Sequence, residues 1–314
     1  MASPALLFYR PADASLAIGI VDDAGHLAPG QSSTARLGWT HILAAGHHIV
    51  FYALTDGSLT IGHVSTDGQF VQTQATTILP GWTDVEASGD RLLFYRDDDG
   101  SLAITYIDGS TGELIQTYSG SAATGWDDIV AMHDSDILFY SYATGALVVG
   151  HLGEDNALVQ TQSSFTATGW KEIVPVDFGS IVLFYRFGDG ALTIGHVSPD
   201  GQFVQIQDSG PNMPRWSHIV SMGPKVVFYR IDDGLLMTAY VDNLGHLGRL
   251  QSSTIAAGFN SVVVAGDAIV FYNPETGSLL IAHIDQAGHL VTTQSSEAAK
   301  DWILVSLITF DPID

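Results

Sequence analysis

The chain has 314 residues, 46% of them apolar and 14% charged, and it contains no cysteine, so disorder, a disulfide framework and a thiol nucleophile are excluded. Its 11 Lys and Arg residues against 34 Asp and Glu give a formal net charge of −23. Such a surface repels phosphate backbones and anionic lipids, so we expect no nucleic-acid partner and no membrane insertion.

The N-terminal stretch "MASPALLFYR" lacks the basic and long apolar regions of a signal peptide. Part of it, "ALLFYR", already belongs to the repeat described next, so its removal would delete a strand. No apolar run reaches the roughly 18 residues of a membrane-spanning helix. We expect a soluble chain, either cytoplasmic or secreted by a route without a signal peptide.

Two markers divide the chain into seven units. The pair Phe-Tyr begins at Phe8, Phe51, Phe94, Phe139, Phe184, Phe228 and Phe271. A second aromatic series follows it at Trp39, Trp82, Trp126, Trp170, Trp216, Phe259 and Trp302. Both recur every 43 to 46 residues with no helical pattern, which is typical of the blades of a β-propeller.

Each unit contains four short strand patterns, as in "WTDVEA", "RLLFYR", "SLAITYI" and "ELIQTY" within residues 82–118. Asp-Gly pairs between the second and third patterns, such as Asp56-Gly57, predict two-residue type I′ hairpins. The chain opens on a second strand, residues 5–10, and ends on a lone first strand, residues 302–310. We therefore predict an all-β protein: one seven-bladed propeller domain over residues 1–314, built of four-stranded blades and closed by the C-terminal strand pairing with the N-terminal blade.

Two-residue turns would place Phe51 opposite Gly62 on one face of the sheet, where ring and small residue pack against the next blade. The other face would then carry Tyr52, Ile61, His63, Gln72 and Gln74. Two interpretations are open for this polar stripe. It completes a hydrogen-bonded ladder between blades, with the histidine donating to a neighbouring backbone, or it lines a groove that holds a sugar.

The recurring Trp packs as a wedge between blades or offers its ring to a sugar's C–H face. Two residues after it stands a polar series that forms either a solvated channel rim or a set of acceptors for sugar hydroxyls: His41, Asp84, Asp128, Glu172, His218, Ser261 and finally Leu304. Arginine follows four of the Phe-Tyr pairs, at Arg10, Arg96, Arg186 and Arg230, and either pairs with the acidic turns or contacts a ligand.

No metal site or cofactor is expected. The strand histidines recur on different blades, whose sheets stack roughly 10 Å apart, whereas zinc ligands lie about 2 Å from one point. The string "RDDDGS" lacks the spacing of a calcium loop. Phosphate-loop, dinucleotide and nucleophile-elbow motifs are also missing, so no catalytic residue is assigned.

The repeated unit resembles propeller-repeat proteins of bacteria and fungi, and its architecture is similar to the tachylectin-2, tectonin and integrin-like propeller lectins. This resemblance covers the whole chain and implies glycan binding between adjacent blades. The expected function is a multivalent carbohydrate-binding protein that is not an enzyme, with glycans or glycoconjugates as partners and homo-oligomer formation left open. The candidate carbohydrate-binding residues are Trp39, Trp82, Trp126, Trp170, Trp216, Trp302, His63, His151, His196, His283, Tyr106, Tyr240, Gln74, Gln162, Gln207 and Gln294.

Two alternatives remain. One is a protein-interaction scaffold that uses a single propeller face. The other is an enzyme with a site at the mouth of the central channel, around Asp84, Asp128 and Glu172. Repetition of the same polar positions favours several equivalent weak sites over the single asymmetric arrangement that an enzyme needs.

Overall fold

The computed structural model describes residues 4–22, 24–65, 67–132, 136–153, 157–176, 181–210, 213 and 215–307, and the structural statements below concern these residues. They contain strands and turns only. No described segment forms a helix long and apolar enough to span a membrane.

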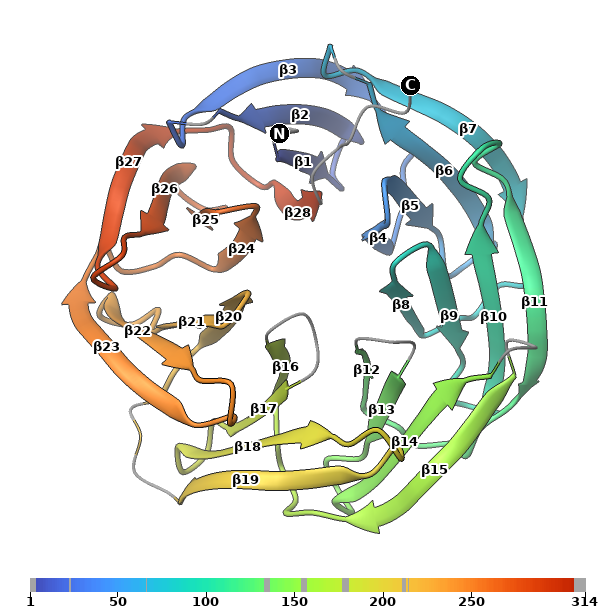
Figure 1. Ribbon diagram of the computed structural model, residues 1–314. Helices are drawn as coiled ribbons and strands as arrows, with labels where there is room; N and C mark the ends of the chain where they lie inside the picture. The colour runs from blue at the N-terminus through green and yellow to red at the C-terminus, as the bar shows by residue number, and fades with distance from the viewer. Residues whose placement is uncertain are drawn as a thin grey trace.

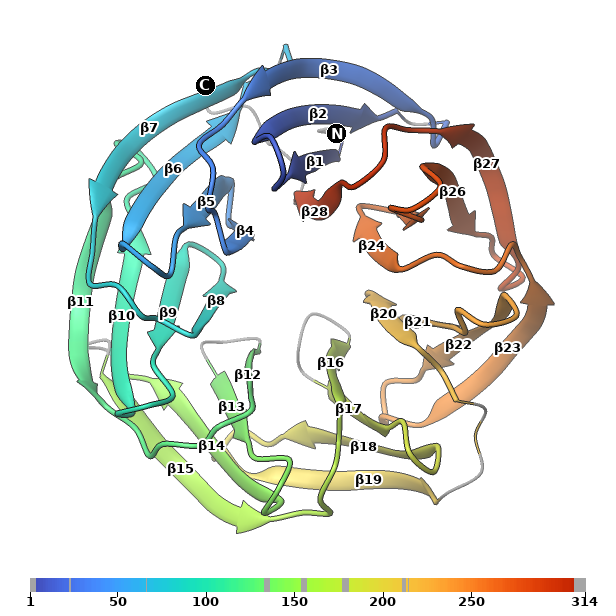
Figure 2. The ribbon, with the colours of Figure 1, turned by 180° about the vertical axis from the view of Figure 1, so that it is seen from behind.

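Seven four-stranded antiparallel sheets form a ring around a central channel (Figures 1 and 2). From the channel outwards the sheets are β28(Ile303–Leu307) β1(Ala5–Arg10) β2(Ser15–Val21) β3(Leu27–Thr34); β4(His41–Ala45) β5(His48–Tyr52) β6(Ser58–Val64) β7(Phe70–Thr77); β8(Asp84–Ser88) β9(Arg91–Tyr95) β10(Ser101–Ile107) β11(Leu114–Ser121); β12(Asp128–Ala131) β13(Asp136–Tyr140) β14(Ala146–Leu152) β15(Leu158–Phe165); β16(Glu172–Val176) β17(Ile181–Arg186) β18(Ala191–Val197) β19(Phe203–Gly210); β20(His218–Met222) β21(Lys225–Tyr229) β22(Leu235–Val241) β23(Leu247–Thr254); and β24(Ser261–Ala265) β25(Ala268–Tyr272) β26(Ser278–Ile284) β27(Leu290–Glu297).

The predicted fold class is confirmed, and so is the closure of the ring. Strand β28 pairs antiparallel with β1, from Ile303 opposite Tyr9 to Leu307 opposite Ala5. The first blade is thereby assembled from both ends of the chain, which removes the open edge that a linear array of blades would leave. The last three residues of the predicted closing strand, 308–310, lie outside the described part of the chain.

The predicted type I′ hairpins are wrong, and the predicted register fails with them. A type I′ turn needs positive φ at both central residues, but of the pair Asp56-Gly57 only Gly57 has it, at 69°. The loop is four residues long, closed by Ala53 N–H bonding to Ser58 O and Gly57 N–H to Ala53 O. Phe51 therefore pairs with Thr60, and Gly62 pairs with Ile49.

Close packing still requires a glycine at position 62, but the aromatic ring above it is that of Phe70 instead of Phe51. A Cβ at this position would lie 2.5 Å from the ring of Phe70 on the neighbouring strand β7. A β-bulge between Ile61 and Gly62 inserts one extra residue in β7, so Ile61 pairs with Gln74 while Gly62 pairs with Gln72. Gln72 therefore lies on the face opposite to Gln74, and the predicted stripe of His63, Gln72 and Gln74 on one face is wrong.

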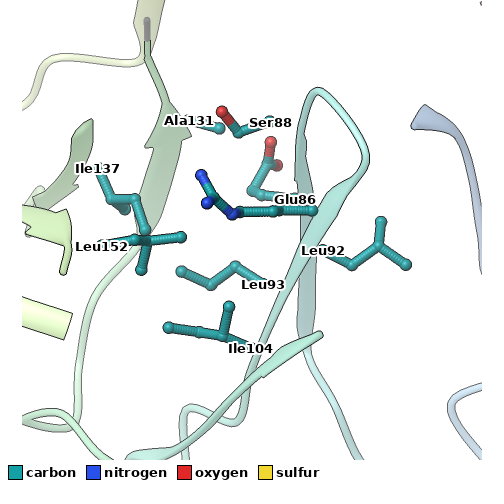
Figure 3. Close-up of a pocket in the computed structure, with 9 residues that line it drawn as sticks. Glu86, Ser88, Leu92, Leu93, Ile104, Ala131, Ile137 and Leu152 are labelled. Atoms are coloured by element: carbon teal, nitrogen blue, oxygen red, sulfur yellow. The ribbon is translucent and has the colours of Figure 1, made fainter. Parts of the chain in front are cut away.

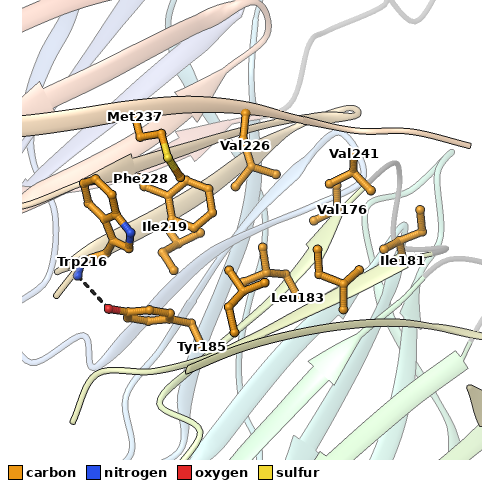
Figure 4. Packing of buried hydrophobic residues seen from close by; sticks show 13 residues of the cluster. Val176, Ile181, Leu183, Tyr185, Trp216, Ile219, Val226, Phe228, Met237 and Val241 are labelled. Carbon is orange, nitrogen blue, oxygen red and sulfur yellow. Dashed lines mark hydrogen bonds between the residues drawn. The ribbon is translucent and has the colours of Figure 1, made fainter. Parts of the chain in front are cut away.

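The tyrosine of each Phe-Tyr pair is fully buried and joins its blade to the next one. In six blades its hydroxyl donates to a carbonyl of the connection to the next blade at 2.5 to 3.2 Å. In the remaining blade, the Tyr185 hydroxyl accepts a hydrogen bond from the backbone N–H of Trp216 at 2.9 Å, as Figure 4 shows. The surrounding core lies between adjacent sheets, with Leu183 and Val176 on one side and Phe228 and Val226 on the other.

Ala14 is strained in a position that the other blades give to glycine. Its φ is 58°, while the corresponding residues Gly57, Gly100, Gly145, Gly190, Gly234 and Gly277 have φ between 69° and 81°. We predict that Ala14→Gly raises the free energy of unfolding by about 0.5–1 kcal/mol, because glycine adopts this conformation without a steric penalty. Urea unfolding measures the change.

Gly57→Ala is the matched control. It should destabilise the protein, because the new Cβ would lie 2.0 Å from the Ile78 carbonyl oxygen in addition to the strain at positive φ. Unchanged or lowered stability of Ala14→Gly would contradict the prediction.

Candidate functional site

The four glutamines predicted for the sugar groove, and Gln31 at the equivalent position of the first blade, join neighbouring blades. The side-chain oxygens of Gln31, Gln74, Gln162, Gln207 and Gln294 accept hydrogen bonds from the backbone N–H groups of Phe70, Leu114, Phe203, Leu247 and Leu27 at 2.5 to 2.8 Å. Each bond runs from the outermost strand of one blade to the start of the outermost strand of the next. The ladder that the sequence suggested therefore exists, and glutamines form it rather than histidines.

The histidines and tyrosines of the predicted stripe stay on separate blades and are not brought together. His63, His151, His196, His283 and Tyr106 are half-buried, and Tyr240 is 41% exposed. Within the part of the chain that the structure describes, the side chains of these histidines make no hydrogen bond.

The recurring Trp rings pack between adjacent blades, against the phenylalanine of their own blade and the core of the preceding one, as the wedge interpretation predicted. Trp82, Trp170 and Trp216 are buried, while Trp39, Trp126 and Trp302 are half-buried. Trp82 lies with its ring centroid 5.9 Å from that of Phe94, and the Arg96 guanidinium lies 5.5 Å from the Trp82 centroid. Arg96 also bonds to both carboxylate oxygens of Asp99 at 2.9 and 2.7 Å, so the predicted pairing of arginine with the acidic turns is confirmed.

The polar series at the channel stands at the start of the innermost strands. His41, Asp84, Asp128, Glu172, His218 and Ser261 each pair with the tyrosine of the neighbouring strand. In the closing blade the residue opposite Tyr9 is Ile303, so the predicted member Leu304 is one position off. A common register therefore puts all seven positions at the same mouth of the channel.

This ring of positions is chemically asymmetric. The acids Asp84, Asp128 and Glu172 begin β8, β12 and β16, which are consecutive around the channel in Figures 1 and 2. Glu86 follows two residues after Asp84, on the same face of β8. Four carboxyl groups thus gather on three of the seven blades.

Burial and mutual repulsion raise the pKa values of these carboxyl groups. Burial, with added repulsion from Asp84 and Asp128, raises the pKa of Glu86 to about 8. Burial and the nearby carboxylates raise the pKa of Glu172 to about 7 and that of Asp128 to about 6. Burial also raises the pKa of Asp84. Near neutral pH the cluster therefore holds both protonated and ionised carboxyls.

Three further polar side chains adjoin the cluster. Tyr142 interacts with Asp128, and burial together with the surrounding acids raises the pKa of Tyr142 to about 12. His41 Nε2 lies 3.2 Å from the Thr83 carbonyl oxygen, and His218 Nε2 lies 3.0 Å from the Asn260 carbonyl oxygen. Because a carbonyl only accepts, each histidine donates from Nε2 to the next blade.

Glu86 lies between a large cavity and a small apolar one. The large cavity, about 490 Å³, is lined by residues of β4, β8 and β28 and includes Glu86 and His41. Figure 3 shows the other side, where Glu86 and Ser88 meet Leu93, Ile137 and Leu152 around a space of about 10 Å³ that Arg91 also lines. Burial disfavours the ionised form of Glu86, while the large cavity gives small molecules room beside it.

Glu86 and Tyr142 were not predicted from the sequence. Glu86 differs from the repeat, because the same position in the other innermost strands is apolar: Leu43, Val130, Val174, Val220, Val263 and Val305. Tyr142 lies in a loop whose sequence varies from blade to blade and offers no such contrast. No group of three or more His, Cys, Asp or Glu among the described residues could hold a metal ion.

Solved structures with this fold include named enzymes. The chain is similar to the periplasmic gluconolactonase of Pseudomonas aeruginosa, with 16% identity, 96% of this chain and 99% of the other covered, and a TM-score of 0.70. It is also similar to a candidate 6-phosphogluconolactonase of Bacteroides fragilis (12% identity, 95% and 96% covered, TM-score 0.71). Kluyveromyces lactis Hsv2p gives 13% identity, 93% and 95% coverage and a TM-score of 0.62.

No protein-family model matches the chain, and no curated protein sequence matches it. At 12 to 16% identity, the structural similarities show the propeller fold. They also correct two expectations from the sequence, namely that the chain is a propeller lectin and that it is not an enzyme. The similar structures include proteins named as sugar-lactone hydrolases, and none of the three is named as a lectin.

The glutamine ladder predicts a difference between equivalent residues. Gln74→Ala should cost about 1–2 kcal/mol of unfolding free energy, because the Leu114 N–H loses its partner. Gln251→Ala is the control, since the described residues show no bond from Gln251 to the next blade, and we expect a cost below about 0.5 kcal/mol. Equal losses in urea unfolding would contradict this role of the ladder.

The raised pKa of Glu86 predicts that stability falls as pH rises. As pH increases from about 4.5 to about 8, Glu86 ionises in the unfolded chain while it stays protonated in the folded one. We expect Glu86→Gln to melt a few degrees higher than the wild type at pH 8 and at the same temperature at pH 4. Thermal unfolding at both pH values measures this, and melting curves with the same pH dependence for the two proteins would show the prediction to be wrong.

Proposed function

We propose that the protein hydrolyses neutral sugar lactones at the channel mouth formed by β4, β8, β12 and β16. The observation that carries the proposal is the asymmetric cluster of Asp84, Glu86, Asp128 and Glu172, whose burial raises their pKa values to different levels. Of the four, Glu86 lines the cavity of about 490 Å³. Pairs of carboxyl groups with separated pKa values supply an acid and a base at the same pH.

Hydrolysis of a lactone needs both of these groups. An ionised carboxylate takes a proton from water as the water oxygen bonds to the lactone carbonyl carbon. The bond between that carbon and the ring oxygen then breaks, and a protonated carboxyl donates its proton to the ring oxygen. Asp128, with a pKa of about 6, suits the role of the base. Glu86, with a pKa of about 8, suits the role of the acid. The Tyr142 hydroxyl, which interacts with Asp128, would help to hold that carboxylate in place.

The charge of the site favours a substrate without phosphate. No lysine or arginine is among the described residues that line the large cavity, and the acidic cluster repels an anion. A neutral lactone enters without this repulsion. Its hydrolysis product is a sugar acid, and the same repulsion then favours release of the product carboxylate.

The names of the similar structures support this class of reaction. One of them is a gluconolactonase, a name that specifies no phosphate, and its structure covers 96% of the present chain.

The proposal predicts glucono-lactone hydrolysis above the spontaneous rate. We expect a bell-shaped dependence of rate on pH between about 6 and 8, the stated pKa values of Asp128 and Glu86. Asp128→Asn and Glu86→Gln should each lower kcat roughly 100-fold or more. Proton release in weakly buffered solution measures the rate.

Asp98→Asn is the matched control, because Asp98 is 80% exposed on the loop before β10. It should keep the wild-type rate. The proposal fails if the wild-type protein does not exceed the spontaneous rate with glucono-lactone, or if the cluster variants retain full activity.

A further inference from the structure

A second cavity lies away from the channel, in the groove between the blade of β4–β7 and the blade of β8–β11. Its volume is about 180 Å³. The apolar part of its lining includes Trp82, Phe94, Ala103 and Leu114, and the polar part includes Gln74 and Thr105.

The cavity coincides with departures from the repeat. Ala103 pairs with Phe94 at a position where other blades carry Thr60, Val148, Thr193, Met237 or Leu280, all of them larger. Only Ala17 of the first blade is equally small. Leu114 stands where Phe70 fills the space over Gly62 in the preceding blade, and leucine also occupies this position in four other blades. The small side chain of Ala103 is therefore the departure that leaves room in this groove.

Thr105 introduces a hydroxyl group that has no partner. It stands where other blades have Gly19, Gly62, Gly150, Gly195, Ala239 or Ala282. Its residue is 4% exposed, and its Oγ1 is buried without a hydrogen bond among the described residues. A buried hydroxyl without a hydrogen-bond partner is unfavourable, so an oxygen or nitrogen atom of a bound molecule would stabilise this group.

Gln74 adds a second donor. Its side-chain oxygen is bound to the Leu114 N–H, which fixes the orientation of the amide. The amide nitrogen makes no hydrogen bond among the described residues, so it is available to an acceptor in the cavity. The two polar groups therefore suit one oxygen atom that accepts hydrogen bonds, while the aromatic and aliphatic lining suits an apolar ring.

We propose that this groove binds a small neutral molecule with an apolar ring and one carbonyl oxygen. Thr105 and Gln74 donate to that oxygen, and the ring packs against Trp82 and Phe94. The size fits, because a cavity of about 150 Å³ in another protein accommodates benzene. The net charge of −23 favours a neutral ligand over an anion. Trp82 and Gln74 were predicted from the sequence to bind a sugar, and here they serve a less polar ligand.

Cyclohexanone tests the proposal. Titration followed by protein NMR should give saturable shifts of the Trp82 indole and Thr105 backbone signals. Thr105→Val keeps the shape but removes the hydroxyl, and we expect binding to weaken roughly three- to tenfold. Ala103→Leu fills the cavity and should abolish saturable binding, while Ala17→Leu, the equivalent change in another blade, should leave binding unchanged.

A crystal structure grown with cyclohexanone should show the ring in the groove with its oxygen on Thr105. Ordered water alone at this place, no saturable binding by the wild-type protein, or equal affinity of wild type, Thr105→Val and Ala103→Leu would overturn the proposal. None of these outcomes depends on lactone hydrolysis at the channel.

Discussion

The buried tyrosine hydroxyl at each junction between blades fixes how one sheet follows the next. It is removed from water, so it must find its partners in the protein, and the connecting segment offers both a carbonyl and a backbone N–H. In the blade of β20–β23, Tyr229 donates to Ala256 O and accepts from Phe259 N–H. Because this bond sets where each connection ends, the innermost strands begin in a common register, and their first side chains gather at one mouth of the channel.

The candidate site lies where single blades carry residues that differ from the repeat. Glu86 occupies a position that is apolar on the other innermost strands, and its burial keeps the carboxyl protonated near neutral pH. The acids of the outer loops behave in the opposite way, because Arg96 and its equivalents lower the pKa of residues such as Asp99. The carboxyls of this chain therefore include both ionised loop partners of arginine and a partly protonated cluster at the channel.

The repeat period and the open ends of the chain were enough to predict the seven blades and their closure, because strongly recurrent markers dominate the pattern. The register was not predictable in the same way. Asp56-Gly57 suits both a two-residue and a four-residue loop, and no residue pattern in the sequence of β7 indicates the extra residue of its bulge. The lectin expectation followed from the polar and aromatic positions that recur in most blades. Glu86 and Tyr142 each stand in a single blade without an equivalent in the others, and they make the candidate site asymmetric.

The most direct measurement is a crystal structure with a lactam analogue of glucono-lactone, in which an N–H replaces the ring oxygen and slows hydrolysis. The account predicts density for the analogue at the channel mouth, with its carbonyl carbon near Asp128 and its ring N–H beside Glu86. Density confined to the grooves between blades, or an empty channel at saturating analogue, would contradict it.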